Sequence, residues 1–108
     1  MSTSPDASDA KLVRDRIPEI IRDTGRVPRV STLDEAAYGR ALSEKLAEET
    51  EEFLTSGQTE ELADILEVVY AIGRLRGTPP EELEALRRSK QAERGGFEQR
   101  LFLEGIDS

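Results

Sequence analysis

The sequence predicts an all-α protein: an antiparallel bundle of about four helices. Charged residues make up 35% of the chain and aromatic residues only 5%, which is typical of helical rather than sheet proteins. Prolines and glycines divide the chain into segments whose apolar residues recur at helical spacing. The 108 residues suit one domain, expected over 11–108, after a polar and disordered tail over 1–10.

The first helix is expected between Pro18, which can begin a helix, and Gly25, which can end one. Isoleucines in this segment supply its apolar face. Pro28 cannot continue a helix, so the residues around it form a connector.

The second helix is expected to begin with a capping box, Thr32 followed three residues later by Glu35, and to run to about Leu54. Glu49 falls inside the apolar stripe of this helix. A carboxylate at such a position breaks the local pattern, and such exceptions concentrate at functional sites.

A short turn over 55–58 follows, in which Gly57 can adopt a left-handed conformation. The third helix is apolar on nearly every side over 62–72, so it must be buried on every side. Because one small bundle encloses such a helix poorly, we expect a homodimer or a higher homo-oligomer.

The fourth helix is expected to begin with Thr78 as its cap, with Glu81 completing a second capping box, and to end at the glycine pair 95–96. The apolar and polar residues over 97–106 are expected to pack back on the bundle.

Cysteine and histidine are absent, which excludes disulfides, thiolate nucleophiles, Cys/His zinc sites and Ser-His-Asp triads. Chemistry must then come from carboxylates, Lys, Arg, hydroxyls and a hard cation such as Mg²⁺, or Mn²⁺ as a substitute. The net charge of −8 argues against a nucleic-acid polymer as partner. The sequence shows neither a secretory signal nor an apolar run long enough for a membrane span, so we expect a cytoplasmic protein without a membrane partner.

Charge is unevenly distributed along the chain. Residues 11–30 hold six basic residues and three acids, whereas residues 44–67 hold nine acids and only Lys45 as a base. An acidic centre and a basic segment of this kind could share a ligand that carries both metal and phosphate.

Two pairs of acids flank the 55–58 turn at mirrored distances. Glu49 and Glu52 are three residues apart, as are Glu61 and Asp64, so each pair lies on one helical face. In an antiparallel hairpin, Glu52 is level with Glu61, and Glu49 is level with Asp64. The four carboxylates converge if the two helices turn these faces toward each other.

Converging carboxylates repel one another, and a divalent cation removes that conflict. The same spacings also occur on exposed helix faces, where acids near a helix start favour the helix dipole. The residues alone leave both interpretations open, although Asp64 in the apolar run "LADILEVV" is hard to place on a solvated face.

The pattern "KLAEETEEFL…EELADILEVVYAI" resembles the MazG-type all-α nucleoside triphosphate pyrophosphohydrolases. The opening "KLVRDRIPEII" and the ending "ERGGFEQRLFL" resemble a compact subgroup that is phosphoribosyl-ATP pyrophosphohydrolase-like. This resemblance implies Mg²⁺ ligands at four positions and a further acid, Glu48, as an additional ligand or the base that orients water. The four implied ligands are Glu49, Glu52, Glu61 and Asp64.

Cationic residues near both ends of the resemblance are candidates for binding the phosphates of a nucleotide substrate. They are Lys11, Arg14, Arg16, Lys90 and Arg94. The expected activity is Mg²⁺-dependent cleavage of a nucleoside triphosphate between its α and β phosphates, which would suit removal of non-standard nucleotides. The alternatives are phosphoribosyl-ATP hydrolysis in histidine synthesis and a non-catalytic helical assembly or regulatory protein.

Overall fold

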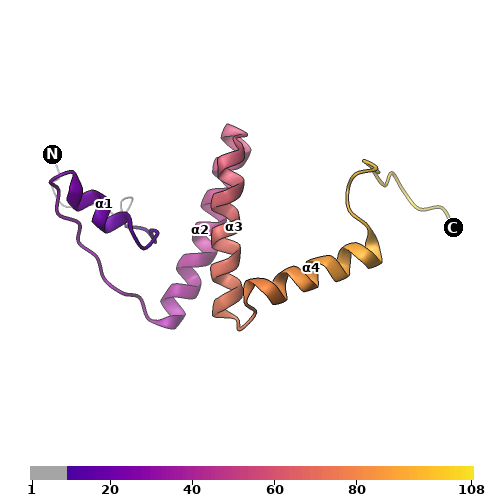
Figure 1. Cartoon of the computed structure of the whole chain (residues 1–108). Coiled ribbons are helices and arrows are strands. Elements are labelled where there is room, and N and C mark those ends of the chain that lie inside the picture. The colour runs from indigo at the N-terminus through magenta and orange to yellow at the C-terminus, as the bar shows by residue number, and fades with distance from the viewer. Residues whose placement is uncertain (1–9) are drawn as a thin grey trace.

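The protein is described by a computed structural model that covers residues 10–108. Its helices are α1 (Ile17–Asp23), α2 (Glu35–Ser56), α3 (Thr59–Leu75) and α4 (Pro80–Arg94), and no strand occurs among these residues (Figure 1). The predicted all-α fold with four helices is confirmed. The predicted disordered tail lies outside the described residues except for Ala10.

Helices α2 and α3 form an antiparallel hairpin at the centre of the molecule (Figure 1). Gly57 ends α2 in the left-handed conformation, with φ 68° and ψ 13°, and its N–H donates to the carbonyl of Phe53 at 2.8 Å. A side chain at this position would be strained, so glycine fits the turn as predicted.

The start of α2 differs from the prediction. Asp34, not Thr32, is the N-cap: its carboxylate accepts a hydrogen bond from the N–H of Ala37 at 2.8 Å. The expected capping box was therefore wrong, because Asp34 directly precedes the first helical residue and Thr32 lies two residues too early.

The predicted cap of α4 was also wrong. Pro79 occupies the N-cap position without a side-chain hydrogen bond, and Pro80 is the first helical residue. Thr78 instead helps to close α3, because its N–H donates to the carbonyl of Gly73 at 2.7 Å. A Cβ on Gly73 would lie 2.7 Å from the carbonyl oxygen of Thr78, so this close approach requires glycine.

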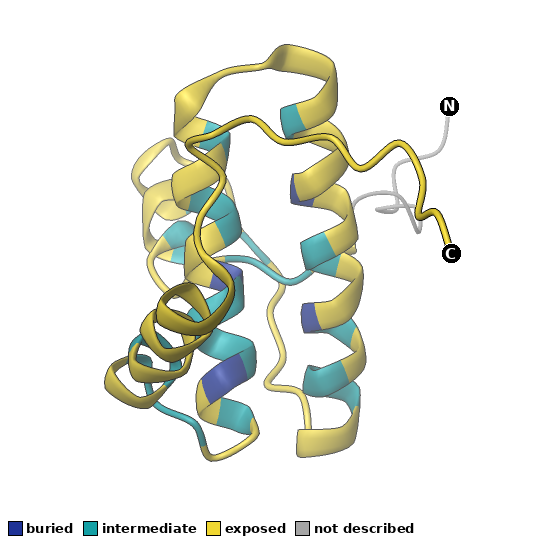
Figure 2. Cartoon of the chain, turned by 90° about the vertical axis from the view of Figure 1, so that its right-hand side faces the viewer, coloured by how far each residue is buried: buried dark blue, intermediate teal, exposed yellow. Residues whose placement is uncertain are grey.

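The core of one chain is thin. Buried positions occur only in α2 and α3 among the described residues (Figure 2), and the large apolar ones are Leu42 and Val68. Other large apolar side chains of α3 stay accessible, and Leu66 is 50% exposed. A single chain thus leaves part of the apolar surface of the hairpin uncovered.

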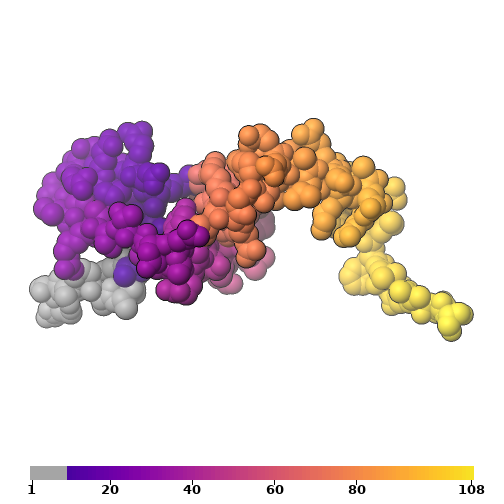
Figure 3. Space-filling model, turned by 90° about the horizontal axis from the view of Figure 1, so that it is seen from below, coloured from indigo at the N-terminus to yellow at the C-terminus, as the bar shows by residue number. Residues whose placement is uncertain are grey.

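Helix α4 contacts α3 and then extends away from the hairpin (Figure 1). The molecule is therefore elongated, with extents of 63 × 32 × 26 Å (Figure 3). The prediction that residues 97–106 pack back on the bundle was wrong, because α4 carries them away from it and leaves Phe97 94% exposed. Within residues 10–108, no helix has both the length and the apolar character needed to cross a bilayer.

Candidate metal centre

Five carboxylates from α2 and α3 meet in two overlapping groups. Carboxylate oxygens of Glu48, Glu49 and Glu52 can all lie within 4.8 Å of one another. Oxygens of Glu49, Glu61 and Asp64 satisfy the same limit, so Glu49 belongs to both groups. Spacings of three residues place the side chains on one face of each helix, and the hairpin turns these faces together. Across the hairpin, the structure groups Glu49 with Glu61 and Asp64, whereas Glu52 is grouped with Glu48 and Glu49 of its own helix.

Glu49 is the buried member of these groups, with only 7% of its surface exposed. It lies on the side of α2 that packs against α3, which explains why an acid stands in an apolar stripe. A buried carboxylate is costly without a charged or hydrogen-bonding partner. Its cationic partner is Lys45, whose Nζ lies 3.3 Å from a Glu49 oxygen.

The pKa values show that the acids interact across the hairpin. The pKa of Glu52 is raised, first by the negative charge of Glu49, then by desolvation and by the charges of Glu61 and Glu48. The pKa of Glu48 is instead lowered, chiefly because Lys45 donates a hydrogen bond to it. The charges of the neighbouring acids therefore disfavour the ionised form of Glu52, and a bound cation would relieve this repulsion.

Two cations contact the carboxylates directly. The Nζ of Lys45 is 2.9 Å from Oε1 of Glu48 in addition to its contact with Glu49. Burial acts to lower the pKa of Lys45, but its hydrogen bonds to Glu48 and Glu49 and their charges raise it overall. In addition, Nη2 of Arg14 donates to Oδ1 of Asp64 at 2.7 Å.

A cavity of about 1370 Å³ adjoins the acidic groups, between α2 and the N-terminal segment, residues 10–33. Polar and charged side chains on its wall include Lys11, Arg14, Lys45 and Glu48. Apolar residues such as Ile21, together with Tyr38, line other parts of the cavity. The cavity thus joins cationic groups and a carboxylate of the acidic centre to an apolar wall, which suits a molecule with both anionic and ring-like parts.

The other predicted cations do not all reach this site. Arg16 forms an ion pair with Glu19 at 3.2 Å and does not line the cavity. Lys90 and Arg94 lie exposed on α4, which extends away from the hairpin, and Arg94 contacts the neighbouring Glu93 at 3.5 Å. Within one chain, only Lys11 and Arg14 of the five predicted phosphate contacts lie beside the acidic centre.

Lys45 contacts the acidic centre, and the sequence analysis did not assign it to the site. Its signal was present, because Lys45 stands three residues before Glu48 and four before Glu49, the spacings at which helical side chains form ion pairs. Lys45 is also the only base in the acidic stretch 44–67.

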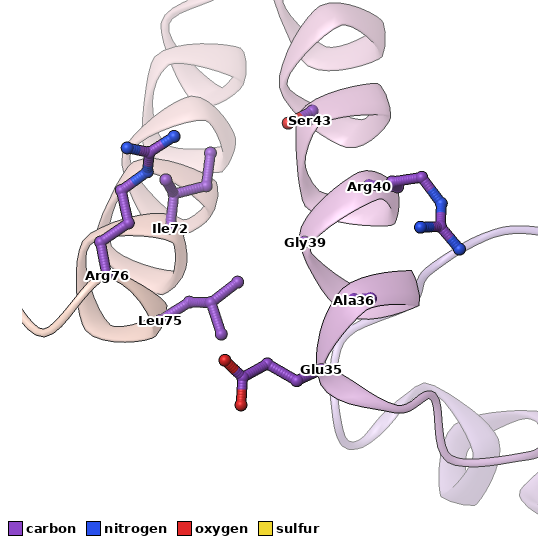
Figure 4. Close-up of a pocket in the computed structure, with 8 residues that line it drawn as sticks. All are labelled: Glu35, Ala36, Gly39, Arg40, Ser43, Ile72, Leu75 and Arg76. Atoms are coloured by element: carbon purple, nitrogen blue, oxygen red, sulfur yellow. The ribbon is translucent and has the colours of Figure 1, made fainter.

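A second hollow, of about 560 Å³, lies between α2 and α3 at the end of the hairpin remote from its turn (Figure 4). Leu75 points from α3 toward α2 in this hollow, where α2 presents Gly39. None of the five converging acids lines it. It is therefore a packing feature of the helix pair and adds nothing to the acidic centre.

The donor set fits a hard divalent cation. All of its candidate ligands are carboxylate oxygens, the type that Mg²⁺ and Mn²⁺ prefer, and the chain has neither cysteine nor histidine. If a metal binds, the shared and buried Glu49 would provide one ligand position held by packing, and the more accessible acids would provide the others.

Comparison with known proteins gives a limited result. An uncharacterized protein of Mycolicibacterium smegmatis is 56% identical over 43 residues, which cover 40% of this chain. The aligned region spans 44% of that relative's own length. No protein-family model matches the chain, and no solved structure matches it.

Proposed function

We propose that the protein is a Mg²⁺-dependent nucleotide pyrophosphohydrolase that converts a nucleoside triphosphate to the monophosphate and pyrophosphate. The observation that carries this proposal is Glu49, a buried carboxylate shared by two groups of acids at the edge of a cation-lined cavity. The resemblance to MazG-type enzymes supports the same reaction. Mn²⁺ should substitute for Mg²⁺, because both accept carboxylate oxygens.

Glu49, Glu52, Glu61 and Asp64 would hold the metal, which supplies charge neutralisation and a more acidic water when bound. Glu48 would accept the proton of the water whose oxygen attacks phosphorus. The bond between that phosphorus and the bridging oxygen breaks, and pyrophosphate leaves. The lowered pKa of Glu48 means that its carboxylate carries no proton at neutral pH, as a general base requires, but it also makes Glu48 a weaker base.

Lys11 and Arg14 would hold the phosphate chain from the cavity side, since both side chains line it. The apolar wall near Tyr38 would cover the base or sugar. A role in removing non-standard nucleotides follows from the resemblance, and base preference is the property that the assay must establish.

Pyrophosphate release from a panel of ordinary and damaged nucleoside triphosphates tests the proposal. We expect Mg²⁺-dependent release by the native protein and a loss of at least about 100-fold in Glu49→Gln. Glu51→Gln is the matched control, because Glu51 is exposed on the same helix and belongs to neither acidic group.

Phosphoribosyl-ATP belongs in the same panel, because cleavage of this substrate alone would assign the reaction to histidine synthesis. Absence of both hydrolysis and Mg²⁺ binding would reject the enzyme and favour a helical assembly or regulatory protein.

We also propose that the chain functions as a homodimer or higher homo-oligomer. The support is the accessible apolar surface of the hairpin, including Leu62 and Leu66, and of the C-terminal segment, including Phe97 and Leu101. Apolar surface of this extent favours burial against another chain. Light scattering at micromolar concentration tests the proposal, and a monomeric mass would reject it.

A further inference from the structure

Two cations from different parts of the chain contact the carboxylates of the acidic centre. Lys45 of α2 contacts Glu48 at 2.9 Å and Glu49 at 3.3 Å. Arg14 of the N-terminal segment contacts Asp64 at 2.7 Å, across 50 residues of sequence. The carboxylates that would bind a metal are therefore already partly neutralised by the chain itself.

A divalent ion and these two cations compete for the same oxygens. A metal bound at about 2.1 Å from a carboxylate oxygen would repel an ammonium or guanidinium group held on the same carboxylate. Lys45 is only 19% exposed, so solvent screens this repulsion weakly there. The Arg14–Asp64 pair is more accessible, with side chains 54% and 41% exposed, and its competition should be weaker.

The same two side chains line the cavity beside the acids. If Lys45 or Arg14 left its carboxylate, its N–H groups would still face this cavity and could donate hydrogen bonds to an anionic ligand in it. Ammonium and guanidinium groups are the usual partners of phosphate oxygens.

We propose that Lys45 and Arg14 are exchangeable counter-cations. They neutralise Glu48, Glu49 and Asp64 in the metal-free protein, and they transfer to the phosphates of the ligand when a metal takes the carboxylates. This inference rests on the proposed function, because it assumes that the carboxylates bind a divalent cation. Its consequence is positive coupling: bound metal frees the groups that phosphate needs, and bound phosphate draws them away from the metal ligands.

The test measures two affinities that should change in opposite directions. Calorimetry with Mn²⁺ alone should give about five- to tenfold tighter binding in Lys45→Met than in the native protein, because a competing cation is removed. Calorimetry with inorganic pyrophosphate on the Mn²⁺-saturated protein should give about tenfold weaker binding in the same variant, because a phosphate donor is removed. Structural damage would weaken both affinities, so it cannot produce this pattern.

Arg14→Gln is the second variant and should show the same signs with smaller changes. It also protects the test against misfolding, since Arg14 is exposed, whereas Lys45 is largely covered. Arg74→Gln is the matched control: it removes one positive charge from an exposed position of α3 that lines neither hollow. Both affinities should stay within about twofold of native in this control. Lys45→Arg should restore both affinities in part, because it restores the charge.

Unchanged or weaker Mn²⁺ binding in both Lys45→Met and Arg14→Gln would overturn the proposal. If nucleotides are still hydrolysed by the native protein in that case, the proposed function stands and only the exchange fails. Opposite changes in the two affinities without any nucleotide hydrolysis would support the exchange and reject the proposed enzyme. Failure of the native protein to bind Mn²⁺ would reject both.

Discussion

Glu49→Gln should remove most of the stabilisation that a divalent cation gives to the protein. Glu49 contributes to both acidic groups, so its replacement takes a ligand from every combination of the other acids. Glutamine keeps the shape of the side chain and removes its charge. Lys45 retains Glu48 as a partner at 2.9 Å, so the metal-free variant should still fold.

The magnitude follows from the spacing of the acids and from mass action. Two carboxylates whose oxygens are within 4.8 Å repel by roughly 3.5 kcal/mol at an effective dielectric constant near 20, and a bound cation cancels this repulsion. At a metal concentration about 100 times Kd, binding stabilises the native state by about 2.7 kcal/mol. For a domain of about 100 residues, this raises Tm by roughly 10–20 °C.

The assay is thermal unfolding followed by circular dichroism, with MgCl₂ or with NaCl at matched ionic strength. The native protein and Glu51→Gln should show the full Mg²⁺-specific rise in Tm, and Glu49→Gln should show almost none. An equal rise in Glu49→Gln, or an equal effect of NaCl on the native protein, would refute a metal centre built on Glu49.

Three further outcomes are expected. The pKa of Glu52 is raised above its ordinary 4.5, chiefly by the charge of Glu49, so ionisation of Glu52 destabilises the folded protein as pH rises. The variant Glu52→Gln should therefore have a higher Tm than the native protein at pH 7 without metal. This difference in Tm should vanish as pH falls below 4.5. Asp34→Ala removes the cap of α2 and should cost about 1 kcal/mol in urea unfolding, whereas Asp34→Ser should retain most of it; equal loss in both would contradict the capping role. Deletion of residues 97–108 should lower the oligomeric mass in light scattering if this segment forms the interface, and an unchanged mass would place the interface elsewhere.

The helical hairpin and its acids could be predicted because they depend on local sequence. Gly57 marks the turn by its tolerance of positive φ. The spacing of Glu49 and Glu52, and that of Glu61 and Asp64, fixes two faces that a short turn brings level. Even the burial of Glu49 could be inferred from its place in an apolar stripe.

The features that were missed depend on backbone geometry and on contacts between distant residues, which the local sequence pattern does not determine. Thr32 and Asp34 are both good caps, and only the backbone geometry decides between them. The contact of Arg14 with Asp64 joins residues 50 positions apart, so no periodicity reports it. The apolar character of Phe97 indicates that it should be buried, but it does not identify the surface that covers it. Because α4 extends away from the hairpin (Figure 1), the hairpin of the same chain does not cover Phe97.

The link between α2 and α3 has only two residues, Gly57 and Gln58. Because the link is so short, the relative orientation of the acids on the two helices depends on its length. Each residue of an α-helix turns the chain by about 100°, so an insertion or deletion in the link would shift the angular phase of one helix against the other. Asp64 would then rotate away from Glu49 even though every acid was still present. The length of a two-residue loop therefore determines how the acids of α2 and α3 face each other, in addition to their identity.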